Sequence, residues 1–220
     1  MDFSIIIESL PALLNATLMT IFLAVVSILI ALVLGFFTAL ARISNLKPLV
    51  KLAAFYVSIF RGTPLLVQVF VIYYGLPQIG IEMEPIPSGI LALSLNAGAY
   101  LSESFRASII SIDKGQMEAS VSLGMTYSQA LRRIILPQSL RIAIPTMSNT
   151  FIILIKDTSL ISVITVTELL QMSSLLIAKT FEPLTIYLLA AALYWVLIAF
   201  FSRLLDKLEK RTSQHITVGN

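Results

Sequence analysis

Long apolar runs alternate with shorter polar segments along the whole chain. Each run is close to the roughly 20 residues that one helix needs to cross the hydrocarbon core of a bilayer. A single crossing segment can satisfy its own backbone hydrogen bonds there only as a helix. The pattern therefore predicts an all-α polytopic membrane protein with five transmembrane helices, at residues 16–41, 54–80, 86–112, 138–156 and 183–203.

The first apolar run follows two acidic residues, Asp2 and Glu8. A secretory signal peptide begins with a positive segment and has a shorter apolar core. We therefore expect this run to be a retained span within a single transmembrane domain over residues 1–212. A polar cytoplasmic tail follows at 213–220. We find no internal repeat of the kind that builds the inverted halves of many secondary transporters.

The composition agrees with a membrane protein and excludes other classes. Apolar residues make up 57% of the chain and charged residues 12%, whereas an average soluble domain has roughly 25% charged residues. So few charges cannot cover a folded surface in water, which argues against soluble, disordered and nucleic-acid-binding proteins. The chain has no cysteine, so disulfides and thiolate metal sites are excluded, and we predict no metal site.

The basic residues indicate an orientation. Lys and Arg gather in segments 42–51, 106–141 and 203–211, whereas the remaining segments are acidic or roughly balanced. Because cytoplasmic loops collect Lys and Arg, the N-terminus is predicted outside and the C-terminus in the cytoplasm. Two short cytoplasmic helices are predicted in the loop 113–137. One spans residues 116–123 and ends at Gly124, and the other spans 128–135 and stops before Pro137. Their apolar stripes indicate either a docking surface or a pair of helices lying on lipid headgroups.

Four blocks of this sequence resemble those of ATP-binding-cassette importer permeases. Glu118-Ala119, Gly124 and Ile134-Ile135-Leu136-Pro137 resemble the EAA loop, with Ser120 in place of its second alanine. Residues 59–68, 99–106 and 154–160 look like the hallmark blocks of the polar amino-acid subgroup, which serves histidine, arginine, glutamine, glutamate and cystine systems. The resemblance extends from about Leu10 to the end of the last span.

This resemblance implies a bacterial inner-membrane permease subunit of an amino-acid importer. It would form half of the translocation path and pair with a second permease subunit, either another copy or a paralogue. An extracytoplasmic solute-binding protein would deliver the substrate. The EAA helices would couple the path to a cytoplasmic ATPase through Gln116, Glu118, Ala119, Gly124, Ile134, Leu136 and Pro137.

The sequence itself supports the assignment of ATP hydrolysis to a separate subunit. It contains no Gly-x-x-x-x-Gly-Lys-Ser/Thr phosphate loop, so it cannot bind ATP by that route. We therefore expect no enzyme activity and no cofactor in this chain, with ATP and Mg on the partner ATPase. A self-contained secondary carrier or channel for amino acids is the alternative. A membrane scaffold that recruits a partner through residues 116–135 is a third possibility.

Charged residues inside predicted spans are candidates for the substrate path. Each costs roughly 2.5–3.5 kcal/mol on insertion scales, so it should be paired or functional. A zwitterionic amino acid needs a cation for its carboxylate and an acid for its ammonium group. The residues that we assign to the path are Arg61, Gly62, Thr63, Gln68, Glu103, Asp157, Thr158, Ser159 and Glu168.

Each candidate also has a simpler interpretation. Arg61, where Gly62 and Pro64 predict a distorted helix, could extend to the headgroups. Glu103 and Arg106 are three residues apart and could form an internal pair. Asp157 and Glu168 could lie in a solvated outer loop or contact the binding protein. Small and polar positions in the spans predict a two-fold interface between permeases or contacts within one chain; they are Ser94, Asn96, Gly98, Ser102, Glu103 and Asn149.

Overall fold

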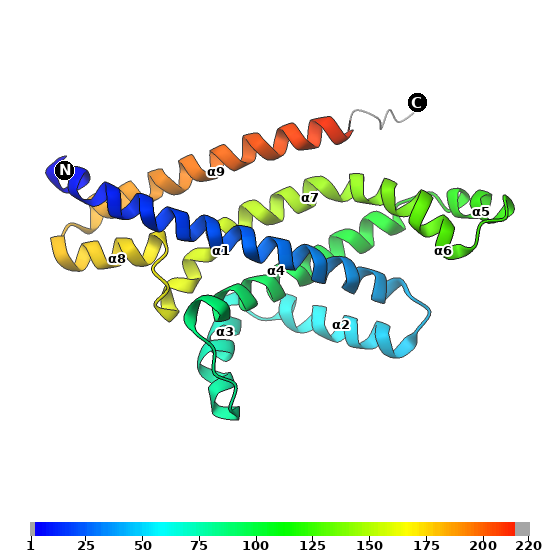
Figure 1. Cartoon of the computed structure of the whole chain (residues 1–220), viewed down its shortest axis with the longest axis horizontal. Helices are drawn as coiled ribbons and strands as arrows, with labels where there is room; N and C mark the ends of the chain where they lie inside the picture. Colours follow the sequence, from blue (N-terminus) through cyan, green and yellow to red (C-terminus); the bar gives the residue numbers. More distant parts are fainter. Residues whose placement is uncertain (1–2, 214–220) are drawn as a thin grey trace.

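A computed structural model describes residues 3–213, and within that range all regular secondary structure is helical (Figure 1). The expected tail thus lies outside the described residues from position 214 onward. The elements are α1 Phe3–Ile43, α2 Lys47–Gly62, α3 Leu65–Phe70, η1 Val71–Gly75, η2 Leu76–Ile79, α4 Pro85–Ile110, α5 Lys114–Ser122, α6 Tyr127–Ala130, η3 Leu131–Ile135, α7 Leu136–Asp157, η4 Thr158–Ile164, α8 Leu169–Thr180 and α9 Pro183–Ser213.

The long helices run along the longest axis of the molecule, with α5 and α6 at one end and α8 at the other, whereas α3 projects sideways near the middle (Figure 1). The helices α5 and α6 share one end with the loop between α1 and α2. The helix α8 and the start of α1 lie at the other end. Three described helical stretches are long and apolar enough to cross a membrane, namely Ser4–Ile43, Tyr127–Ile164 and Pro183–Arg211. The pair Lys47–Gly62 and Leu65–Ile79 meets the same test jointly, although it is bent by 108°.

This bend corrects the predicted span at 54–80. The helix begins earlier, at Lys47, with a proline in its first turn. It ends at Gly62, and Thr63 adopts an extended conformation with φ −122° and ψ 148°. Pro64 causes the break, because it lacks an N–H and disfavours helical geometry in the residue before it. The distortion that the sequence indicated here is thus a complete break.

The loop that the sequence predicts to be cytoplasmic also departs from expectation at its second helix. The prediction that this helix stops before Pro137 is wrong, because the chain remains helical from Tyr127 to Ile164. The π-helical turn η3 makes this possible. The N–H of Leu136 donates to the carbonyl of Leu131, five residues back. Pro137 then enters the first turn of α7, where its missing N–H is tolerated.

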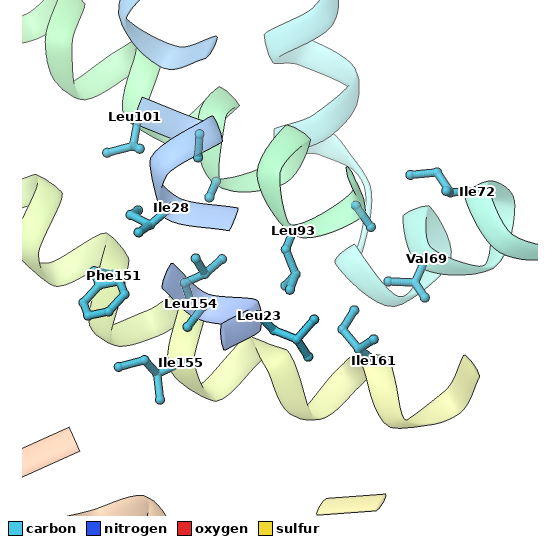
Figure 2. Packing of buried hydrophobic residues seen from close by; sticks show 14 of the residues in the cluster. Leu23, Ile28, Val69, Ile72, Leu93, Leu101, Phe151, Leu154, Ile155 and Ile161 are labelled. Carbon is cyan, nitrogen blue, oxygen red and sulfur yellow. The ribbon is translucent and has the colours of Figure 1, made fainter. Parts of the chain in front are cut away.

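The core forms where α1 packs along α4. Figure 2 shows Leu23 of α1 near Leu93 of α4 and Ile161 of η4, within one buried apolar cluster. Gly35 allows the two helices to approach closely, since a Cβ there would lie 2.8 Å from the Cβ of Leu101. The wider cluster extends through α7 and α9.

This packing corrects part of the expected subunit interface and agrees, at those positions, with the alternative of contacts within one chain. Ser94 and Ser102 are fully buried within the chain. The Ser94 hydroxyl donates to the carbonyl of Ser27 in α1, over 3.3 Å. A Cβ at Gly98 would lie 3.2 Å from that of Leu34, also in α1. These positions in α4 therefore pack inside one chain, and they do not form a surface for a second subunit.

Candidate functional site: a polar cavity at the broken helix

A cavity of about 590 Å³ lies between the broken pair α2–α3, the middle of α4 and the second half of α7. It brings together predicted site residues from three separate segments, namely Arg61 and Thr63, Glu103, and Asp157. The full lining is Arg61, Thr63, Pro64, Leu65, Asn96, Ala97, Tyr100, Glu103, Ser104, Thr146, Asn149, Thr150, Ile153, Leu154 and Asp157.

Glu103 is the centre of the charged part of this cavity. It forms ion pairs with Arg42 of α1, with Arg61 at 3.5 Å and with Arg106 at 2.9 Å. The expected internal pair of Glu103 and Arg106 is thus present, but it belongs to a network that joins α1, α2 and α4. One carboxylate faces three guanidinium groups, so the network keeps a positive excess.

Arg61 extends this network to the cavity wall. Its side chain is 44% exposed, and its guanidinium carbon lies 5.4 Å from the ring centroid of Tyr100. That distance is within the range of a cation–π interaction. Arg61 is therefore held by Glu103 on one side and by Tyr100 on the other, with exposed donors beside the cavity.

Asp157 supplies the opposite charge at the end of α7. It is the last residue of that helix and lines the same cavity as Arg61. Among residues 3–213, no salt bridge includes Asp157. Its carboxylate is therefore available to a cationic group that enters the cavity.

Other predicted path residues lie away from the cavity lining. Thr158 is fully buried, and its hydroxyl donates to the carbonyl of Ile155 at 2.8 Å. The Ser159 hydroxyl donates to Lys156 in the same way. Gly62 precedes the lining residue Thr63 but does not line the cavity itself. Gln68 is 6% exposed, and its side-chain amide donates a hydrogen bond to the carbonyl of Phe60.

Glu168 is neither a cavity residue nor a residue of a solvated loop. It is fully buried at the start of α8, and its carboxylate accepts from the N–H of Gln171 at 2.7 Å. The Tyr194 hydroxyl donates to the same carboxylate at 2.9 Å. Burial raises the pKa of Glu168, and these hydrogen bonds oppose the shift. The arrangement is a helix cap that joins α8 to α9.

The helices α5 and α6 lie at one end of the molecule (Figure 1). The Asp113 side chain caps α5 by accepting from Gly115 N–H. The helix ends at Ser122, and Gly124 two residues further on has a φ of +85°. The N–H of Gly124 bonds to Val121 and that of Met125 to Ser120, which is a Schellman motif. The turn residue predicted at Gly124 is therefore confirmed.

A capping box between Thr126 and Gln129 begins α6. Sequence analysis missed this motif, although the Thr-x-x-Gln spacing is its usual signature. Gln116, Glu118 and Ala119 are exposed on α5, and Leu123 beside them is 82% exposed. Ile134 and Leu136 are half-buried, and Pro137 is exposed. Ser120, in place of the family's second alanine, is buried and bonds to Gln116.

Comparison with known proteins decides the family. Residues 31–214 match the family described as "Binding-protein-dependent transport system inner membrane component". The chain belongs to this family. The L-cystine transport system permease protein TcyB of Bacillus subtilis (strain 168) is 44% identical over 207 residues, covering 94% of this chain and 88% of TcyB. The arginine transport system permease protein ArtQ of the same organism is 36% identical, covering 96% and 97%.

A solved structure agrees with this family. The "Crystal structure of an amino acid ABC transporter with histidines" contains a chain that superposes on this permease with a TM-score of 0.90. It is 36% identical, and the match covers 96% of this permease and 99% of that chain. The chain is accordingly an inner-membrane permease subunit of an ABC transporter, and not a self-contained carrier or channel.

Proposed function

We propose that this permease imports polar amino acids and that the cavity beside the α2–α3 break is part of their path. Arg61 would bind the substrate carboxylate, and Asp157 would bind its ammonium group. The observation that carries the proposal is that these opposite charges, far apart in sequence, line one cavity. Relatives named for cystine and arginine transport support the substrate class.

Five crossings are the arrangement that we propose for the membrane. The broken pair counts as one crossing, and α4 adds a fifth to the three apolar helices. With 26 residues, α4 is about 39 Å long at 1.5 Å per residue, which exceeds the hydrocarbon thickness. Its lower apolarity fits a helix that turns small residues to α1 and polar residues to the cavity.

The proposed orientation is supported by the end of the molecule that holds α5 and α6. The loop between α1 and α2 lies at this end too, and α9 runs toward it (Figure 1). The three chain segments that are rich in basic residues thus lie at or toward one end of the molecule, which supports a cytoplasmic location for that end. We propose that α5 and α6 dock on a cytoplasmic ATPase, with the exposed Leu123 as an apolar contact.

A second permease subunit would complete the path. Thr146 and Asn149 of α7 line the cavity and are exposed to its open side. Polar side chains at membrane depth need a protein or water neighbour. We therefore assign the subunit interface to α7, in place of the α4 positions that pack against α1. An extracytoplasmic solute-binding protein would load the substrate.

Reconstitution into proteoliposomes tests the proposed function. The permease is combined with its ATPase and binding protein, and uptake of labelled cystine, arginine and glutamine is measured. We expect uptake of at least one of these amino acids, and we expect this uptake to require ATP on the side of the membrane where the ATPase lies. Uptake driven by an ion gradient without the ATPase, or no uptake of any polar amino acid, would contradict the proposal.

A further inference from the structure

A pair of side-chain amides holds the break between α2 and α3. The Gln68 amide nitrogen lies 3.0 Å from the Phe60 carbonyl oxygen, 3.1 Å from the Thr63 carbonyl oxygen and 2.9 Å from the Thr63 hydroxyl. The Asn96 amide nitrogen, from α4, lies 3.0 Å from the Phe60 carbonyl oxygen and 3.0 Å from the Gln68 amide oxygen. Three chain segments therefore meet at two amides.

The break needs such partners because it leaves carbonyl groups at the end of α2 without helical N–H donors. The last carbonyls of a helix have no intrahelical N–H, and the bilayer interior offers no water to replace it. The Phe60 carbonyl receives bonds from both amides, and the Thr63 hydroxyl donates to the carbonyl of Ile59 at 2.8 Å. These side chains thus supply hydrogen-bond donors to the carbonyls at the C-terminal end of α2.

The amide of Gln68 has no hydrogen to spare for a ligand. Its nitrogen carries two hydrogens, and three oxygen atoms lie within 3.1 Å of it. Its oxygen accepts from Asn96. The residue is 6% exposed and is not part of the cavity lining. Arg61 and Thr63, which do line the cavity, are the residues on either side of Gly62 at the break.

We infer that Gln68 is a positioning residue, which acts with Asn96 to fix the α2–α3 break and thereby places Arg61 and Thr63 at the cavity wall. This inference rests on the proposed function, because it takes the cavity to be the amino-acid path. It replaces the expectation that Gln68 touches substrate. Without the amide pair, the bend of 108° loses the bonds that join its two sides.

A distance measurement across the break tests the inference without transport. Cysteines are introduced at Phe55 and Val71, which lie on either side of the break and are more than half exposed, and they are spin-labelled in the assembled complex. The chain has no cysteine of its own. An excess of unlabelled permease is added, so that few complexes contain two labelled subunits and the measured distances lie within one chain. We expect one narrow distance distribution for the otherwise unchanged permease and a clearly broader one for Gln68→Leu.

The variant Gln68→Glu adds a readout that depends on pH. It keeps the oxygen that accepts from Asn96, but its second oxygen replaces the donor nitrogen. The ionised form faces three oxygen atoms, whereas the protonated form can donate one hydrogen bond. We therefore expect the ratio of uptake by Gln68→Glu to uptake by the unchanged permease to rise as pH falls, with the distance distribution narrowing in parallel. Gln68→Leu should lower the maximal uptake rate about tenfold at every pH.

Gln171→Leu is the matched control, because it makes the same change in α8, away from the cavity. It should leave both the distances and the uptake unchanged. An unchanged distance distribution in Gln68→Leu would overturn the inference. If uptake were lost at the same time, the result would indicate direct contact between Gln68 and the substrate. If Gln68→Leu does not assemble, Gln68→Glu decides, and a pH-independent defect overturns the inference. Absence of amino-acid uptake by the unchanged permease would instead refute the proposed function and leave the distance result standing.

Discussion

Replacing Glu103 by glutamine removes the only negative charge from its network with Arg42, Arg61 and Arg106, as far as residues 3–213 are concerned. Two unit charges about 4 Å apart interact by about 4 kcal/mol at an effective dielectric constant of about 20. Mutual repulsion among the guanidiniums already offsets part of this attraction. Solvent screens another part, because the exposed fractions are 22% for Glu103 and 20–44% for the arginines.

We expect Glu103→Gln to lower the free energy of unfolding by about 2 kcal/mol, which lies between the values typical of surface ion pairs and of buried ion pairs. The measurement is thermal denaturation of the purified transporter complex. Glu84→Gln is the control, because it makes the same change at the exposed start of the same helix and should shift stability by less than about 0.5 kcal/mol.

A double variant tests the electrostatic cause. Arg42→Met combined with Glu103→Gln removes one of the cations that the glutamine leaves unpaired. The double variant should therefore be more stable than Glu103→Gln alone, which is a non-additivity expected for residues in direct contact. Equal melting temperatures for Glu103→Gln and Glu84→Gln would refute the reasoning, as would a double variant that shows the sum of the two single losses.

Other substitutions test the coupling loop, the cavity and the core. Gly124→Leu places a side chain at a φ of +85°, which costs about 1–2 kcal/mol; the permease should still reach the membrane but lose substrate-dependent ATPase stimulation, and full uptake would contradict the docking role. Asp157→Asn should weaken substrate-stimulated ATPase activity more than basal activity, whereas equal loss would indicate a structural role. Gly35→Ala should destabilise the complex by about 1–3 kcal/mol through overpacking, while Gly75→Ala, whose new Cβ would meet its nearest atom at 3.8 Å, should not.

The membrane class and the loop turn could be predicted because each depends on local sequence. The length of an uncharged apolar run indicates whether that run can cross a bilayer. Gly124 follows a short helical stretch, which is where glycine commonly ends a helix. Pro64 indicated a distorted helix for a similar local reason. The bend of 108° could not be predicted, because its angle depends on Gln68 and Asn96, which are far apart in sequence.

Pro137 shows the limit of local rules. A proline normally ends a helix at the preceding residue, yet here a π-helical turn shifts the hydrogen-bond register and the helix continues. Glu168 shows a different limit. Its place in a polar segment between spans suggested a solvated loop, but the fold buries it as the cap of α8 beside Tyr194. Both outcomes depend on packing that the local pattern does not contain.

The two polar faces of α4 explain why part of the expected interface was misplaced and how the error could be avoided. Ser94, Gly98 and Ser102 recur every four residues on the face that meets α1. A serine hydroxyl can bond to a nearby backbone carbonyl, as Ser102 does with Ala99, so it can be buried against another helix at little cost. Asparagine and charged side chains have more groups to satisfy than their own helix can supply. They therefore require a polar neighbour or a cavity, and Asn96 and Glu103 lie on the face that has both.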